Sequence, residues 1–179
     1  MEASARKRKI LVIRSATRIL NPTLQALKKE FPDCGITVLA PESVKDALEQ
    51  DPLVDEVLTI GNHCRFSVLN YGIGNLRNLR RRRFDLAVSL YNIDSGKGYS
   101  NIDFLAWASR AASIRGYNPR GVYADLSGGK VFRKFLLEKT SFLITLANLA
   151  ATAVLFALIT LGLLGEWCVR KCTASARQT

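Results

Sequence analysis

Charge is missing from the C-terminal part of this 179-residue chain, where no charged side chain occurs from residue 140 to residue 165. A membrane-crossing helix needs about 20 mainly apolar residues. The uncharged run therefore predicts one transmembrane helix within residues 140–167, with basic residues on both sides and Trp167 at the interface. The alternative is a buried core helix, which is disfavoured because core helices seldom run so long without a charge.

A long apolar run is absent near the N-terminus, where only residues 10–13 are continuously apolar. This is far shorter than the apolar region of a signal peptide. We therefore expect residues 1–139 to be cytosolic and the chain to be a single-pass protein of the inner (cytoplasmic) membrane. The positive-inside bias points weakly the same way, with four basic residues before the helix and three after it.

Histidine and cysteine are scarce, with one His and four Cys. His63 beside Cys64 has no second pair of ligands at metal-site spacing, so no metal site is expected. Cys34 and Cys64 are expected to be reduced in the cytosol. Cys168 and Cys172 follow the helix; lipidation, pairing across a dimer and no special role all stay open.

Glycine is missing from the loop at residues 15–21, which excludes a dinucleotide fingerprint there. Residues 96–98 read Gly-Lys-Gly, without the upstream glycine and the following Ser or Thr of a phosphate loop. No cofactor is expected.

Acidic residues are few: residues 1–139 hold 23 Lys or Arg and 14 Asp or Glu, a net charge of +9. Such a domain could face nucleic acid or anionic lipid. The basic runs at 6–9 and 80–83 contain no aromatic residues to stack on bases, and a membrane helix follows them. We therefore expect membrane lipid as a partner and no nucleic acid, although both runs could be solvated surface.

Short apolar runs alternate with helical patterns along the rest of the chain. Strands are expected at 9–14, 36–39, 56–60, 86–90 and 113–115, and helices at 22–31, 42–50, before the Arg run at 80–83, and at 101–112. This order predicts an α/β fold, a Rossmann-like parallel sheet with helices on both faces, over residues 1–126. A hinge (Ser127, Gly128, Gly129) and an amphipathic interfacial segment are expected at 127–139, the transmembrane helix at 140–167 and a short basic tail at 168–179.

Two loops follow the carboxyl ends of the expected first and fourth strands, where parallel α/β sheets bind ligands. Both are polar. The ligand-binding candidates are Arg14, Ser15, Thr17 and Arg18 in the first loop and Asn92, Asp94, Ser95 and Lys97 in the second. The second loop could hold a sugar hydroxyl or a phosphate, or be ordinary surface.

Several short segments carry a family resemblance through their order and spacing along the chain. They are KILVIR (9–14), PTLQALKK (22–29), FPD (31–33), ITVL (36–39), PLVDEVL (52–58), LRRRRFDLAVSL (79–90) and SIRGYN (113–118). Together they resemble the N-terminal, acceptor-binding domain of bacterial heptosyltransferases, glycosyltransferase family nine. The resemblance covers about residues 9–123. It implies half of a GT-B fold and transfer of a sugar to an acceptor hydroxyl, in a cleft shared with a second, donor-binding domain.

Two departures from that family bear on function. Its first loop usually carries a Gly-Asp pair whose Asp is the expected base, and residues 15–21 contain neither; Asp94 is the candidate substitute. The apolar helix also begins where the linker to the donor domain should be. The sequence thus supports either a glycosyltransferase-like subunit of envelope polysaccharide or lipid-linked sugar synthesis, completed by a donor-binding partner, or a non-catalytic membrane-bound interaction module. A truncated gene product is a third reading.

The apolar helix itself offers a surface for association. Ala147, Ala151, Leu158 and Gly162 share one helical face beside Asn148 and Thr152. Small residues let membrane helices approach closely, and an amide in hydrocarbon seeks a partner. A homo-oligomer through this helix is therefore predicted, with lipid-facing alanines as the alternative.

Overall fold

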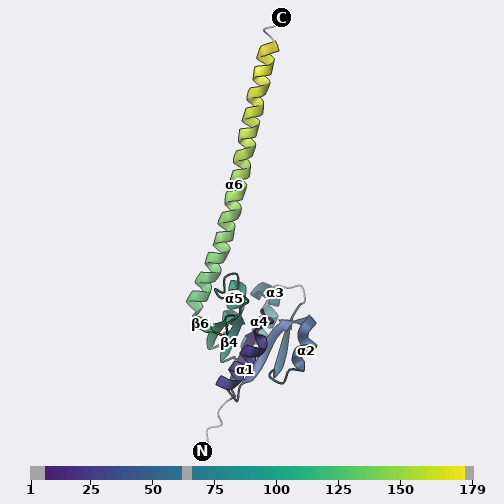
Figure 1. Cartoon of the computed structure of the whole chain (residues 1–179), viewed down its shortest axis with the longest axis vertical. Coiled ribbons are helices and arrows are strands. Elements are labelled where there is room, and N and C mark those ends of the chain that lie inside the picture. Colours follow the sequence, from purple (N-terminus) through teal and green to yellow (C-terminus); the bar gives the residue numbers. More distant parts are fainter. Residues whose placement is uncertain (1–6, 62–65, 176–179) are drawn as a thin grey trace, which may run out of the picture. The chain divides into compact units, whose positions relative to one another are not determined.

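The computed structural model describes residues 7–61 and 66–175, with side chains up to Trp167 apart from Phe142. Six strands form one sheet: β1 (Lys9–Ile13), β2 (Gly35–Pro41), β3 (Glu56–Ile60), β4 (Leu86–Leu90), β5 (Ser113–Tyr117) and β6 (Tyr123–Asp125). Their order across the sheet is β3-β2-β1-β4-β5-β6 (Figure 1). β1 to β5 are parallel, and β6 runs antiparallel to β5.

The five expected strands are all present. β1 and β4 occupy the centre because their residues are almost wholly apolar and buried on both faces, as parallel strands between two helical layers must be. The chain moves outward from β1 to β3 and then returns to place β4 on the other side of β1. The strand order therefore reverses between β1 and β4, and a crevice is expected at their carboxyl ends.

The edge strand β6 is a correction to the expected all-parallel sheet. The turn after β5 is built by Asn118, whose Oδ1 accepts hydrogen bonds from the backbone amides of Arg120 and Val122 at 3.0 and 2.9 Å. Gly121 takes a positive φ of 75° in the same turn. β5 also extends two residues beyond the expected 113–115, since Arg115, Gly116 and Tyr117 pair with β6.

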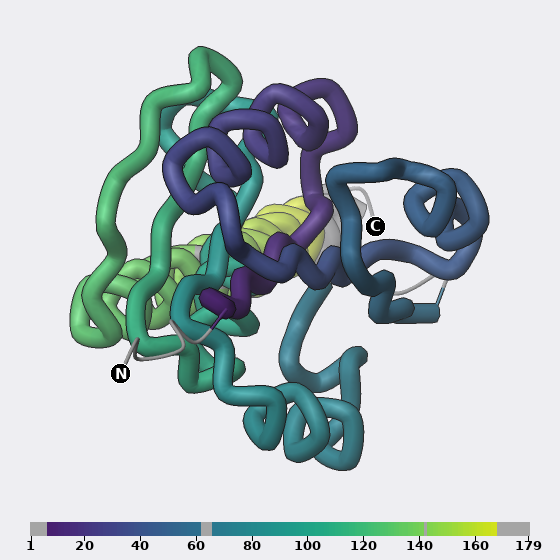
Figure 2. The backbone as a smooth tube through the Cα atoms, turned by 90° about the horizontal axis from the view of Figure 1, so that it is seen from below, coloured from purple at the N-terminus to yellow at the C-terminus, as the bar shows by residue number. Residues whose placement is uncertain are grey.

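Helices cover both faces of the sheet, as predicted. α1 (Leu20–Glu30) and α2 (Lys45–Glu49, after the short 3-10 helix η1, Glu42–Val44) pack on one face. α3 (Val68–Tyr71), α4 (Ile73–Arg81) and α5 (Ser100–Ala108) pack on the other. Figure 2 shows α1 and α4 on opposite sides of the strands. α5 ends four residues before the expected 112, because Arg110 has a positive φ of 59° and turns the chain into β5.

The last helix, α6, runs from Gly128 to Ser175. Gly128 and Gly129 were expected to form a hinge, but they occupy its first turn, where the Ser127 hydroxyl accepts a hydrogen bond from the Lys130 amide. The chain divides into two compact units, residues 1–136 and 137–179, so the first turns of α6 belong with the sheet. Within the described residues one helical stretch, Gly128–Trp167, is long and apolar enough to cross a membrane, and an 18-residue window in it has a mean hydropathy of 2.3.

Candidate functional site

A polar pocket lies at the reversal of strand order and contains three of the predicted site residues. Thr17 and Arg18 reach it from the loop after β1, and Asn92 reaches it from the loop after β4. Ile19 and Pro119 complete the lining, and the cavity volume is about 390 Å³. All three polar side chains are exposed, so a ligand here would meet a guanidinium, a hydroxyl and an amide. This chemistry suits sugar hydroxyls and phosphate oxygens.

Arg14 and Ser15 hold the first loop in place behind this pocket. A guanidinium nitrogen of Arg14 donates to Thr17 Oγ1 at 3.2 Å, and the Ser15 hydroxyl donates to the Leu90 carbonyl at the end of β4. Burial lowers the pKa of Arg14 from its ordinary value, although arginine stays charged in proteins. Its Nε is buried and has no hydrogen-bond partner among the described residues. Arg14 thus brings positive charge to this edge of the sheet.

The rest of the second loop lies away from the pocket lining. Asp94 forms an exposed ion pair with Arg120 at 2.7 Å. The Ser95 hydroxyl accepts from the Lys97 amide at 3.5 Å, and both side chains are exposed. The structure therefore brings Thr17, Arg18 and Asn92 together, and leaves Asp94, Ser95 and Lys97 outside that set.

An apolar pocket adjoins the polar one and shares Arg18, Ile19 and Pro119 with it. Its remaining lining comes from α1 and from the end of β5, through Pro22, Thr23, Ala26, Tyr117 and Gly121, and its volume is about 250 Å³. Arg18 therefore stands between a polar compartment and an apolar one. This arrangement fits an amphiphilic ligand with a polar head and a hydrocarbon part.

A buried polar cluster supports the second loop from below. The Tyr91 hydroxyl donates to Asp103 Oδ1 at 2.6 Å, and Lys134 Nζ donates to Asp103 Oδ2 at 2.5 Å. Burial, followed by the charge and hydrogen bond of Asp103, raises the pKa of Tyr91 well above its usual range. The Tyr91 ring packs against Gly96 and meets the Tyr99 ring edge-on. The cluster thus joins the first turns of α6 to α5 and to the loop after β4.

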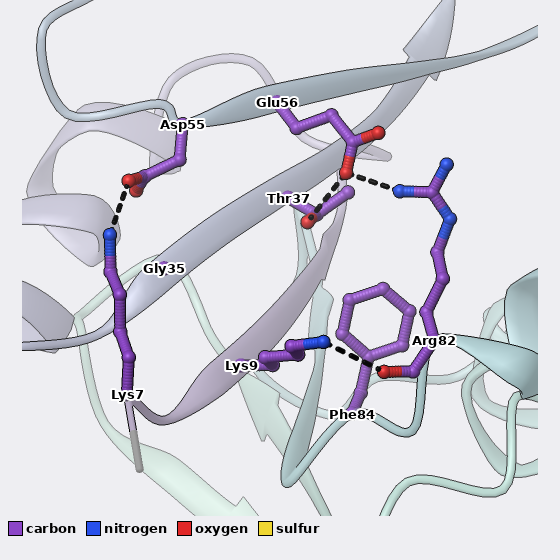
Figure 3. A pocket seen from close by; sticks show the side chains of 8 residues that line it. All are labelled: Lys7, Lys9, Gly35, Thr37, Asp55, Glu56, Arg82 and Phe84. Carbon is purple, nitrogen blue, oxygen red and sulfur yellow. Dashed lines mark hydrogen bonds and ion pairs between the residues drawn. The ribbon is translucent and has the colours of Figure 1, made fainter. Parts of the chain in front are cut away.

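A third pocket, of about 380 Å³, lies at the amino edge of the sheet (Figure 3). Its acidic side chains already have cationic partners. Lys7 and Lys28 bind Asp55 at 2.9 and 3.0 Å, and Arg82 pairs with Glu56. Parallel sheets bind ligands at the opposite edge, so we regard this pocket as a structural ion-pair cluster.

No gathering of three or more metal-ligating side chains occurs in the part of the chain that the structure describes. His63 and Cys64 lie outside those residues, as do the side chains of Cys168 and Cys172.

Comparison with known proteins gives a likeness in fold. The chain is similar to a glycosyl transferase of family 9 from Veillonella parvula DSM 2008, with 21% identity and a TM-score of 0.46 over 62% of this chain. It is similar to E. coli ADP-heptose lps heptosyltransferase II, with 22% identity and a TM-score of 0.48 over 63% of this chain. It spans about a third of each, 32% and 31%. No protein-family model and no curated protein matches the sequence.

Sequence reasoning missed the residues that act through tertiary packing. Pro119 and Ile19 line the pocket, but neither proline nor isoleucine in a sequence indicates a binding site. Asp103 did carry a signal, because it stands between apolar neighbours on a helix and a buried carboxylate needs partners. Its partners Tyr91 and Lys134 lie 12 and 31 residues away, and only the fold identifies them.

Proposed function

We propose that this chain is a membrane-anchored, heptosyltransferase-like subunit of cell-envelope polysaccharide or lipid-linked sugar synthesis. One observation carries the proposal: Thr17, Arg18 and Asn92 converge from two separate loops on a single pocket at the reversal of strand order. Ligand sites of open α/β sheets lie at this position. The succession of segments that resembles glycosyltransferase family nine supports the same function.

The adjoining apolar pocket favours a lipid-linked ligand over a free sugar. A sugar phosphate would occupy the pocket of Thr17, Arg18 and Asn92, and the first part of its hydrocarbon chain would follow Arg18 into the pocket beside α1. The uncharged helix would keep the protein at the surface where such lipids are found. The cytosolic placement of residues 1–139 in the inner membrane is part of this proposal.

The proposal assigns donor binding to a part other than residues 1–179. The chain spans about a third of the solved glycosyltransferases that it resembles. A sugar transferase with two lobes needs acceptor and donor in one cleft, and much of its rate comes from that positioning. We therefore expect the chain alone to bind an acceptor without turnover, and a donor-binding subunit to complete the cleft.

A second candidate function is a non-catalytic, membrane-bound interaction module. One observation favours it: no carboxylate lines the polar pocket among the described residues, and Asp94 is ion-paired to Arg120 outside that lining. A general base must come within hydrogen-bond reach of the acceptor hydroxyl. Asp94 would have to leave Arg120 to serve as one.

Acceptor binding is tested by titrating the detergent-solubilised full chain with a polyprenyl-phosphate sugar and with the free sugar phosphate. Losing the Arg18 guanidinium removes a charge-assisted hydrogen bond worth about 1.5–3 kcal/mol, so Arg18→Met should weaken binding about tenfold to a hundredfold. Lys29→Met removes an exposed cation in the last turn of α1, outside the linings of both pockets, and is the control. Equal affinity in wild type and Arg18→Met would refute binding at this pocket. Purification from membranes followed by identification of bound proteins then tests for the donor-binding partner.

A further inference from the structure

Two apolar side chains on the helical layer of the sheet are almost fully exposed. Leu69 is 91% exposed and Ile73 is 85% exposed, more than any other large apolar side chain that the structure describes. They lie four residues apart in α3 and at the start of α4, a segment that we call the α3–α4 corner (Val68–Arg81). Single exposed apolar residues are common, but two at this exposure within one short segment make it a candidate binding surface.

Local structure keeps both side chains in solvent. Ser67 caps α3 by accepting a hydrogen bond from the Asn70 amide, and Tyr71 and Leu76 fill the buried side of the corner. Between them Gly72 takes a positive φ of 83° and separates α3 from α4. Tyr71 and Leu76 fill the core on the buried side of the corner, and among the described residues Leu69 and Ile73 are left exposed.

The segment that contains the corner carries charge of one sign, and of its arginines Arg82 is paired with Glu56 of β3. Residues 66–84 contain five arginines and no acidic residue. Arg77 lies one helical turn after Ile73 and is exposed, and Arg80 and Arg81 follow in the last turn of α4. Apolar side chains followed by cations form the pattern of a segment lying in an anionic lipid interface, where each cation adds about 1 kcal/mol of attraction.

The corner belongs to the same layer as the beginning of α6. α3 contacts α5. The Phe135 ring of α6 stacks on Phe104 of α5 at 4.6 Å between ring centroids. Phe132 and Leu136, in these first turns, are each 52% exposed. The corner and the first turns of α6 are therefore both joined to α5.

We propose that the α3–α4 corner inserts Leu69 and Ile73 into the surface of the anionic bilayer in which α6 is anchored. This inference rests on the membrane anchoring stated under the proposed function. The anchor keeps the corner at high effective concentration near lipid, so a small apolar contact suffices. Insertion adds a contact between the sheet domain and the lipid surface.

The test uses the full chain with its native cysteines replaced (Cys34→Ala and the other three by Ser) and an environment-sensitive fluorophore on Leu69→Cys or Ile73→Cys. The proteins are reconstituted in vesicles containing about one third phosphatidylglycerol. We expect blue-shifted emission that nitroxide-labelled lipids quench. The matched control is Asp33→Cys, which precedes β2 at the amino edge and is exposed; its label should emit as in water.

Three outcomes overturn the proposal. Emission as in water at both positions means that the corner does not touch lipid. A blue shift that nitroxide lipids do not quench means that protein covers the corner, a second copy if the shift fades on dilution in lipid. Release of the protein from the vesicles by alkaline carbonate means that the anchor itself is absent, and then the proposed function fails with this inference. If the protein stays in the vesicles after carbonate treatment but its label emits as in water, this inference is refuted and the proposed function is not.

Discussion

Lys134 Nζ lies 2.5 Å from Asp103 Oδ2, and the Asp103 carboxylate is completely buried. Lys134 belongs to the second turn of α6 and Asp103 to α5, and Tyr91, whose hydroxyl binds the other carboxylate oxygen, follows β4. A buried carboxylate is tolerated only when it is paired and hydrogen-bonded. The pair therefore fixes the start of α6 to the sheet domain and holds Tyr91 beneath the candidate site.

Removing the Lys134 ammonium group should lower the free energy of unfolding. Lys134→Met leaves Asp103 buried without its cation, and breaking one side of such a pair costs about 3 kcal/mol. Lys130→Met removes an exposed lysine one turn earlier and should be nearly neutral. Urea unfolding in nanodiscs, followed by Trp107 fluorescence in a Trp167→Phe background, measures both changes. Equal stability of the two variants would contradict a structural role for the pair.

Gly116 leaves room for Tyr91. A Cβ at Gly116 would lie 2.6 Å from two carbons of the Tyr91 ring, so Gly116→Ala must displace the ring or the strand. Overpacking of this kind costs about 1–3 kcal/mol. Gly74→Ala, where an added Cβ has no atom within 4 Å, should instead stabilise α4 by about 0.5–1 kcal/mol. Thermal unfolding with opposite shifts for the two variants is the expected result; parallel shifts would refute this account of Gly116.

Asp55 makes the fold sensitive to acid. Burial raises its pKa, but the Ile36 amide, Lys7 and Lys28 lower it more, to about 2 from the usual 3.8. Because the folded pKa is below the unfolded one, the carboxylate stabilises the fold above pH 3.8 and loses this contribution as the pH falls towards 2. Lys28→Met should move the acid unfolding midpoint to higher pH, and Lys29→Met should not. Acid titration by circular dichroism compares them, and identical midpoints would exclude this role of Lys28.

Association through the apolar helix stays a prediction with a direct assay. Thr152 Oγ1 donates to the Asn148 carbonyl at 2.8 Å, so the threonine is satisfied within its own helix. The Asn148 amide is then the stronger candidate for contact between helices, worth roughly 0.6–2 kcal/mol. Asn148→Leu and Ala151→Leu should each weaken dimerisation in a membrane two-hybrid assay, and Ala153→Leu, on the opposite face of the helix, is the control. Unchanged signals in both would leave the helix as an anchor only.

The sequence predicted the elements whose signals are local. β3 and β4 match their expected ranges, because a short apolar run bounded by charged or turn residues is typical of a buried strand. β6 was missed because its three residues are all exposed and only pairing with β5 makes them a strand. The glycines at 128 and 129 were expected to form a hinge, but packing of Gly128 against Trp107 lets the helix begin there.

The sequence identified the two loops that form the candidate site, but not the side chains that converge there. The parallel topology brings the carboxyl ends of β1 and β4 together. Predicting this required only that both strands be identified in the sequence. Which side chains converge depends on loop geometry. The ion pair of Asp94 with Arg120 comes from the turn after β5, and no sequence pattern places that turn beside residue 94.

Nucleotide release in proteoliposomes tests the central claim most directly. The purified chain is given a panel of nucleotide sugars and lipid-linked acceptors, alone and then with a soluble donor-binding Rossmann-domain protein recovered with it from membranes. We predict no release above a protein-free control for the chain alone, because no carboxylate lines its polar pocket among the described residues. We predict release when the partner is added, and its loss in Arg18→Met. Release by the chain alone that disappears in Asp94→Asn would contradict the account and show that the chain is a complete enzyme.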